Sequence, residues 1–326
     1  MLAVLLDFLR ALINSYGISI LLFQALRLLV GERWGLIAFF NTFAEWLLLP
    51  SIFLTVIALL TQSWLSVALC VPPLLMFIVG YGQQYIPRSI STPRAAPTVS
   101  VLTYNVLADP HPLDQAIAML RASGADIIGL QEVSKQYDSV LKAALSDLYP
   151  YVASHPQPLR FDGQAVYSKF PILEDTYWQY EWLPTPLGHQ RVVLQLPTTT
   201  FVLYNVHPTH PGMNGKNFDP SYRAREIADL LQRIGRETLP VIMMGDFNMP
   251  DHSDDYRALR KQLEDSYRDV GWGMGWTFRA MLPLAFLRLD YVFHDKHWET
   301  LRAEVVQPHG GSDHFAVLAR VALVMD

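Results

Sequence analysis

The segment PVIMMGDFNMP, residues 240–250, decides the fold because it joins an apolar run directly to two polar side chains. The run from Val241 to Met244 is continuously apolar, which predicts a strand that is buried on both faces. Asp246 and Asn248 follow it at once. A carboxylate and an amide in this place indicate that chemistry takes place at the end of the strand.

The same pattern recurs on both sides of this segment. Short apolar runs alternate with stretches of helical periodicity, which indicates an α/β domain. Further strands are predicted in VSVLTYNV (99–106), DIIGLQEV (126–133), AVYSK (165–169), RVVLQL (191–196), TFVLYNVH (200–207), LRLDYVFHD (287–295) and SDHFAVLARVAL (312–323), with helices near 112–123, 134–147, 220–236 and 253–264. We therefore expect one catalytic domain over residues 99–326.

The ends of these strands carry most of the polar side chains that could perform chemistry. They are Asn105, Glu132, His207, Asp246, Asn248, Asp290, Asp313 and His314. Hard oxygen ligands suit magnesium or manganese, and the single cysteine, Cys70, lies in an apolar run outside this domain. Histidines nearby can transfer protons or place positive charge against a phosphate. The set predicts metal-assisted phosphoryl transfer.

The motifs LTYNV, LQEV, NVH, GDFN, LDY and SDH follow one another in this order across residues 99–322. The series resembles the endonuclease/exonuclease/phosphatase superfamily, which includes pancreatic-type deoxyribonuclease, inositol-polyphosphate phosphatases and neutral sphingomyelinases. The resemblance implies a four-layer α/β/β/α sandwich and a metal-dependent phosphoric ester hydrolase. Abasic-site endonucleases have an acid where this chain has Leu107, so the resemblance to that branch is incomplete.

The resemblance implies a role for each matched residue around the metal and the attacking water. Glu132 would be the principal metal carboxylate, with Asn105 beside it. Asp313 would be a further metal ligand or would organise the ligands. Asp246 would orient or deprotonate the water, and Asn248 would donate a hydrogen bond to the transition state.

The remaining roles concern the phosphate. The resemblance implies that His314, held by Asp290, contacts the scissile phosphate, and that His207 contacts it from the other side. Two oriented imidazoles beside a metal are what in-line displacement at phosphorus requires. Arg191 and His210 are additional candidates for binding the substrate.

The N-terminal third has a different composition from the rest of the chain. Residues 1–96 contain five Lys/Arg and three Asp/Glu, and apolar stretches occupy 11–30, 36–60 and 64–80. Crossing the hydrocarbon core of a bilayer takes about 20 apolar residues. We therefore expect a multi-pass integral membrane protein with two or three transmembrane helices within residues 1–85.

A linker and a charge bias follow from the same region. Residues 86–98, IPRSISTPRAAPT, contain three prolines among small polar residues and predict a semi-extended tether. With either two or three spans, Arg27, Arg33 and the arginines of the tether fall on the side of the catalytic domain. The positive-inside rule then places that domain in the cytoplasm.

The charge of the catalytic part bears on the choice of substrate. Residues 97–326 contain 20 Lys/Arg and 27 Asp/Glu, a net charge of −7, so no overall positive field attracts a polyanion. The stretch MLPLAFL (281–287) either packs on the scaffold or contacts acyl chains. These features favour a phospholipid or lipid-linked phosphodiester as substrate, with membrane lipids as partners. A membrane-tethered nuclease acting on DNA or RNA is the alternative, and no oligomeric state is predicted.

Overall fold

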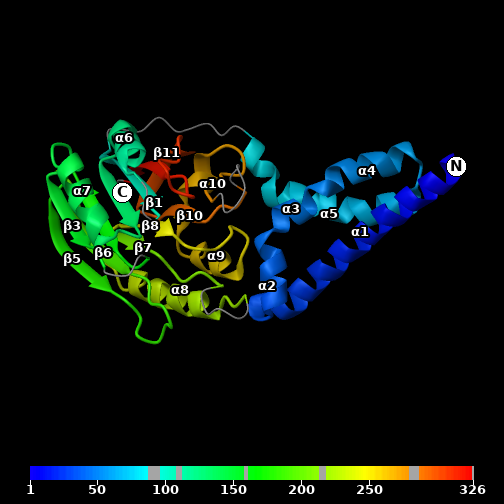
Figure 1. The fold of residues 1–326 in the computed structure, drawn as a ribbon, viewed down its shortest axis with the longest axis horizontal. Coiled ribbons are helices and arrows are strands. Elements are labelled where there is room, and N and C mark those ends of the chain that lie inside the picture. Colours follow the sequence, from blue (N-terminus) through cyan, green and yellow to red (C-terminus); the bar gives the residue numbers. More distant parts are fainter. Residues whose placement is uncertain (87–95, 108–111, 158–160, 213–217, 279–285, 325–326) are drawn as a thin grey trace.

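The computed structural model describes the whole chain except residues 87–95, 108–111, 158–160, 213–217, 279–285 and 325–326. It consists of an α/β part and a helical part that projects from one side of it, with the N terminus at the far end (Figure 1). Most of the predicted tether and most of the stretch MLPLAFL lie outside the described residues.

The α/β part contains two six-stranded sheets. In spatial order, the first consists of β11 (Trp298–Val305), β12 (Val317–Leu323), β1 (Thr98–Asn105), β2 (Ile127–Gln131), β4 (Gln164–Ser168) and β3 (Tyr151–His155). The second consists of β5 (Ile172–Trp178), β6 (His189–Gln195), β7 (Thr200–Val206), β8 (Val241–Asp246), β10 (Asp290–His294) and β9 (Glu264–Asp265). The pairs β1–β2 and β7–β8 are parallel, and the other strand pairs are antiparallel.

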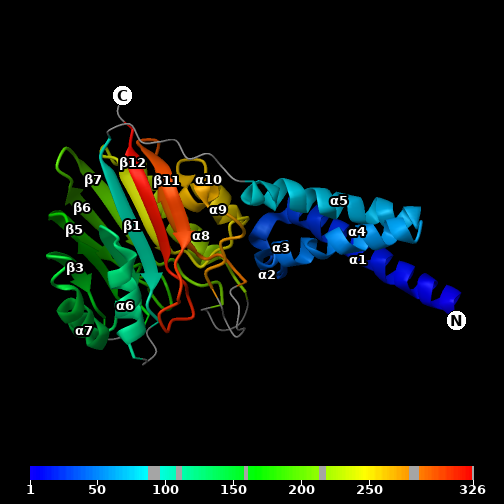
Figure 2. The same ribbon diagram turned by 90° about the horizontal axis from the view of Figure 1, so that it is seen from above.

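Helices cover the outer face of each sheet, as the view in Figure 2 also shows. On the first sheet, α6 (Asp114–Ser123) and α7 (Lys135–Leu145) bury one apolar cluster. On the second, α8 (Ser221–Ile234) and α9 (Asp254–Leu259) bury another, and the short α10 (Ser266–Val270) contacts the strands beside them. A third cluster fills the space between the sheets. The predicted four-layer α/β/β/α sandwich is confirmed.

The alternation of side chains along a strand carries the polar groups into the space between the sheets. In β1, Val99 and Val101 belong to the core between the sheets, so Asn105 projects from the same face. In β8, Ile242 and Met244 belong to the same core, so Asp246 also projects from the face toward the other sheet. The functional edge is thus the end of the inter-sheet core.

The described N-terminal part up to Tyr85 consists of helices joined by short turns. It contains α1 (Leu2–Val30), the short η1 (Gly31–Arg33), α2 (Gly35–Thr42), α3 (Ala44–Leu48), α4 (Pro50–Leu60), α5 (Trp64–Tyr81) and the short η2 (Gly82–Tyr85). Two segments are long and apolar enough to cross a membrane, Ala3–Arg33 and Trp64–Tyr85. Large apolar side chains such as Phe8 and Val79 lie exposed on these two segments, as lipid-facing residues do.

The middle apolar stretch, residues 36–60, is bent, and the structure leaves both two and three spans open. Its two helical pieces, Gly35–Thr42 and Ala44–Leu60, meet at an angle of 73°. The helix breaks at Phe43, whose φ and ψ of −111° and 26° are not helical. Buried polar residues flank the break. On one side the Asn41 amide donates to Glu32 at 2.5 Å, and on the other Glu45 is only 5% exposed. The bent pair is compatible with a broken span or a re-entrant segment.

Candidate active site

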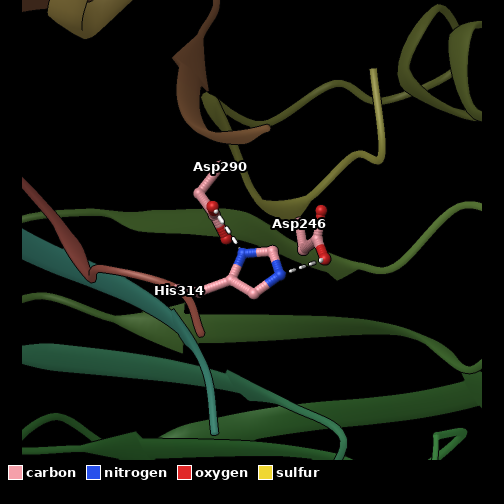
Figure 3. Close-up of side chains that lie close together, drawn as sticks. All are labelled: Asp246, Asp290 and His314. Atoms are coloured by element: carbon pink, nitrogen blue, oxygen red, sulfur yellow. Dashed lines mark hydrogen bonds and ion pairs between the residues drawn. The ribbon is translucent and has the colours of Figure 1, made fainter. Parts of the chain in front are cut away.

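Two carboxylates face each other across neighbouring strands at the edge of the second sheet. Asp246 ends β8 and Asp290 begins β10, and the antiparallel register places them directly opposite. Two like charges in this position repel, so a cation is needed between them. The ring of His314 supplies it (Figure 3): Nδ1 lies 2.8 Å from Asp290 Oδ2, and Nε2 lies 3.6 Å from Asp246 Oδ2.

Burial and charge act in opposite directions on this trio. Burial disfavours a charged imidazole, but the carboxylates of Asp290 and Asp246 outweigh it and raise the pKa of His314 to about 10. Burial likewise favours a neutral Asp246, but His314 and His207 hold the pKa of that carboxyl well below its usual range. At neutral pH the structure therefore holds a protonated His314 beside an ionised Asp246.

A second group of side chains also surrounds Asp246. The Asn105 amide donates to Glu132 Oε1 at 2.8 Å and to Asp246 Oδ2 at 3.1 Å, so one side chain from β1 connects both carboxylates. His207 Nε2 lies 3.5 Å from Asp246 Oδ2 and 4.0 Å from Glu132 Oε1. Burial opposes protonation of His207, but Asp246 and Glu132 prevail and raise its pKa.

Two of these residues have backbone conformations that side chains other than glycine rarely adopt. Glu132 has a φ of 62° and Asn248 a φ of 51°. Such conformations cost on the order of 1–3 kcal/mol each and persist where the surrounding structure enforces them. Asn248 is held by its amide, which donates to Pro208 O at 3.0 Å, and by its backbone N–H, which donates to Asp246 Oδ1 at 2.9 Å.

Gly245 allows strand β8 to bring Asp246 this close to the neighbouring strand. Its φ is 154°, and a Cβ at this position would lie 1.9 Å from Val206 O. No side chain can replace it without moving β8 away from β7, which leads to His207. The glycine of the GDFN motif is thus required by packing at the site.

The structure does not bring Arg191 to this cluster. Arg191 pairs with Tyr204 in the β6–β7 register, on the face covered by α8, whereas Asn205 and His207 project toward the other sheet. Its guanidinium binds Glu237 at 2.7 Å and Glu174 at 2.9 Å. These two ion pairs give Arg191 a structural place on the outer surface.

His210 and Asp313 lie at the edge of the cluster. His210 is exposed, its Nδ1 accepts from the Gly212 N–H at 3.0 Å, and it is close enough to Asp246 and His207 for their charges to act on it. Asp313 is partly exposed and adds to the charges that raise the pKa of His314.

Sequence reasoning missed two residues that support the site. Arg223 of α8 is only 2% exposed, and its guanidinium donates to Asn248 O and, at 2.7 Å, to Asp255. The signal was present, because Arg223 lies in the buried stripe of α8 with Ile227. The second residue is Phe278, whose ring centroid lies 4.8 Å from that of His314.

The donor atoms fit a hard divalent metal. The oxygens of Glu132 and Asp246 converge on one amide, and the site contains oxygen and imidazole donors only, which suits magnesium or manganese. Asp246, Asp290 and His314 also have possible ligand atoms within 4.8 Å of one another. In that trio both ring nitrogens of His314 already face carboxylates and the ring is protonated, so a carboxylate outside the trio, such as Glu132, is better suited to hold a metal.

Known structures share the fold of this chain. A crystal structure of an endonuclease/exonuclease/phosphatase from Bacteroides vulgatus is 18% identical, with a TM-score of 0.59, over 70% of this chain and 100% of that chain. D. rerio TDP2 complexed with a single-strand DNA product is 16% identical, with a TM-score of 0.58, over 69% and 98%. The human Nocturnin catalytic domain with bound sulfate is 18% identical, with a TM-score of 0.55, over 70% and 96%. At these identities the likeness shows the fold alone.

The sequence itself establishes the family. A comparison with curated proteins finds no match. The family profile described as Endonuclease/Exonuclease/phosphatase family, in contrast, matches residues 102–314, which is more than half of the chain and includes the site from Asn105 to His314. Members of this family are hydrolases that act on phosphoesters and generally depend on a divalent metal. The chain therefore belongs to the endonuclease/exonuclease/phosphatase family.

Proposed function

We propose that this protein is a membrane-anchored, divalent-metal-dependent phosphodiesterase that cleaves a phospholipid or a lipid-linked phosphodiester. One observation carries the hydrolytic part of the proposal. Two buried imidazoles with raised pKa values, His207 and His314, place their Nε2 atoms 3.5 Å and 3.6 Å from the same oxygen, Oδ2, of the ionised Asp246. This arrangement places the positive charge of His314 beside an ionised carboxylate that can accept a hydrogen bond from water and orient it.

The metal would be held by Glu132 and Asn105, with Asp313 as a third ligand or an organiser of the ligands, and magnesium is the first candidate. When bound, it would withdraw electron density from the phosphate and offset its charge. The proposal assigns these three residues to metal binding because their side chains are oxygen donors at the edge of the same inter-sheet core.

The chain's own residues supply the rest of the reaction. Asp246 orients the water and takes its proton as the new P–O bond forms and the ester P–O bond breaks. His314 and His207 stabilise the charge that accumulates on the phosphate oxygens, and a protonated imidazole can return a proton to the leaving oxygen. Asp290 fixes the tautomer of His314, and Asn248 donates to the transition state.

The lipid part of the proposal rests on the surroundings of the site. The chain has two helices long enough to span a bilayer, and the bent helix between them contacts loops that border the site. The net charge of −7 over residues 97–326 does not favour a nucleic acid. His210 stays a candidate contact for the substrate, and Arg191 is left out because its guanidinium is bound elsewhere.

The nuclease alternative is favoured by one comparison, since the similar D. rerio TDP2 structure contains a single-strand DNA product. The two functions differ in the salt dependence they predict. Binding through many phosphates weakens steeply with rising salt, whereas binding through acyl chains does not.

An activity panel tests the proposal. The full-length protein in detergent is assayed with magnesium or EDTA on bis-p-nitrophenyl phosphate, mixed phospholipid micelles, plasmid DNA and RNA. We expect magnesium-dependent cleavage of the simple diester and the phospholipid, abolished by Asp246→Asn. The matched control is Asp229→Asn, because Asp229 of α8 binds Arg233 of the same helix and accepts from the Tyr180 hydroxyl, away from the site. Faster cleavage of DNA or RNA than of phospholipid would overturn the lipid assignment.

A further inference from the structure

One loop connects the active site to the membrane helices. It runs from Met249 to Ser253, directly after Asn248, and leads into α9. At its far end it lies against the end of α1: Arg27 donates to His252 O at 2.7 Å. Figure 1 shows this region where the helical part meets the α/β part.

The same end of α1 forms a reciprocal pair with the start of α9. The Glu32 N–H donates to Asp254 Oδ2 at 3.0 Å, and the Asp254 N–H donates to Glu32 Oε2 at 3.1 Å. Asn41 of α2 holds the other oxygen of Glu32 at 2.5 Å. Two backbone N–H groups from separate parts of the protein thus depend on each other's side chains, which fixes their relative position.

His252 extends this contact to three more helices. Its Nε2 donates to the carbonyl of Asn41 at the end of α2, and its Nδ1 lies 3.1 Å from the Tyr81 hydroxyl of α5. The same nitrogen lies 3.7 Å from the Glu45 carboxylate of α3 and 3.2 Å from Asp251. The side chain of His252 is 16% exposed, so these partners largely replace water.

On its other side the loop is held by the catalytic domain. Asp251 binds Arg268 of α10, and Arg223 of α8 binds both Asp255 and the carbonyl of Asn248. The loop is therefore clamped between the two parts of the protein. The same loop adjoins Asn248, whose φ is 51°.

A second loop makes the same connection to His314. Trp46 of α3 stacks on Trp276 at 4.7 Å and donates from Nε1 to Phe286 O at 2.8 Å. The Phe286 N–H donates to Phe278 O, and the Phe278 ring contacts His314. The membrane helices thus contact the loops that carry or support groups on both sides of the site.

We propose that the membrane helices position the active site as well as anchoring it, with Arg27, Glu32 and His252 acting as positioning residues through Asn248. The inference rests on the proposed phosphodiesterase activity. It predicts that docking of the helices affects turnover even for a small, water-soluble substrate that has no contact with lipid. A tether that only delivers the enzyme to a membrane would leave such turnover unchanged.

The test compares two arginines of the same helix in the full-length protein. Arg27→Met removes the contact to His252 O, whereas Arg10→Met removes a similar contact, to Thr61 O at 3.2 Å, at the distant end of the helices. Hydrolysis of bis-p-nitrophenyl phosphate is measured in detergent. We expect kcat of Arg27→Met to fall on the order of tenfold with little change in KM, because small misplacements of reacting groups are costly. Arg10→Met should match the wild type, and Arg27→Lys should recover part of the loss.

Hydrogen exchange provides a readout that does not depend on activity. Amides 247–255 should exchange faster in Arg27→Met and at the wild-type rate in Arg10→Met, while the melting temperature of the α/β part stays unchanged. If the wild type hydrolyses no diester but the exchange result holds, the proposed activity fails and the structural coupling stands. The inference would be overturned if Arg27→Met kept the kcat and the amide exchange rates of the wild type. It would also be overturned if Arg27→Met and Arg10→Met lost kcat to the same extent.

Discussion

Replacing Asp290 with Asn should lower turnover far more than it lowers substrate binding. Asp290 is completely buried, and its Oδ2 lies 2.8 Å from His314 Nδ1. The carboxylate fixes the tautomer of the ring and stabilises its protonated form as negative charge grows on the phosphate. An asparagine occupies the same space but carries no charge, so it removes the stabilisation without emptying the site.

The expected loss follows from the kind of interaction removed. A preorganised electrostatic group in a site shielded from water contributes about 2–4 kcal/mol to transition-state stabilisation. This corresponds to a decrease in kcat of about 30- to 900-fold at 25 °C. Because the interaction strengthens mainly in the transition state, kcat and kcat/KM should fall together while KM changes little.

Steady-state kinetics and thermal unfolding separate this role from a structural one. His314→Ala should be at least as damaging as Asp290→Asn, and the double variant little worse than the worse single one, because the two residues act as a unit. The reasoning is refuted if Asp290→Asn lowers the melting temperature but leaves the kinetics of the folded enzyme near wild type. Full additivity of the two changes would refute it equally.

Three further outcomes are expected. Chelation by EDTA should abolish hydrolysis and magnesium should restore it, whereas Glu132→Gln should stay nearly inactive at any magnesium concentration tested, because a direct carboxylate ligand is lost. Arg191→Gln should leave kcat and KM unchanged, since its partners are Glu237 and Glu174; a large increase in KM would return Arg191 to the site. Asp265→Asn should destabilise the α/β part by about 3–5 kcal/mol in chemical denaturation, because it removes the nearer of the two carboxylates that pair with the buried Arg288 and leaves only Asp251 at 3.6 Å. Burial opposes ionisation of Asp265, but Arg288 lowers the pKa of this carboxyl in the folded protein. The stability that the ion pair contributes is therefore fully present above the pKa of the unfolded carboxyl and is lost as the pH falls toward the pKa of the folded one. An Asp265→Asn variant that loses as much stability on acidification as the wild type would contradict this.

The buried strands could be predicted from the sequence because strands that are buried on both faces consist of continuous apolar runs. The run in 240–248 becomes β8, Val241–Asp246, and the run in 99–106 becomes β1, Thr98–Asn105. Strand β5, Ile172–Trp178, was missed because it lies at the edge of its sheet and exposes Leu173 to Thr176 to solvent. An edge strand of this kind has no apolar run by which to recognise it.

The site could be predicted as far as the ordered motifs reach. They led to the residues that meet around Asp246, although those residues are far apart in the chain. Arg191 lies away from the cluster because the face on which it projects depends on strand register: Gln190 pairs with the inward Asn205, so Arg191 must point outward. Strand register is set by the pairing between two strands, and a shift of that register by one residue moves every side chain of the strand to the opposite face of the sheet. Spacing along one strand does not contain that information.

The composition break between residues 1–96 and the rest predicted two independent units, and the interface limits that independence. The α/β part has its own core, so a protein that begins at Ala96 should still fold cooperatively. It would, however, leave His252 and Asp254 without Arg27 and Glu32, and the loop after Asn248 would be held from one side only. We therefore expect the truncated protein to bind magnesium but to hydrolyse bis-p-nitrophenyl phosphate more slowly than the full chain, with the loss in kcat. Equal kcat for the truncated and full-length proteins would show that the helices serve as an anchor alone.

Composition did not indicate this interface. Its polar contacts join single residues from distant segments, whereas composition is an average over a whole segment.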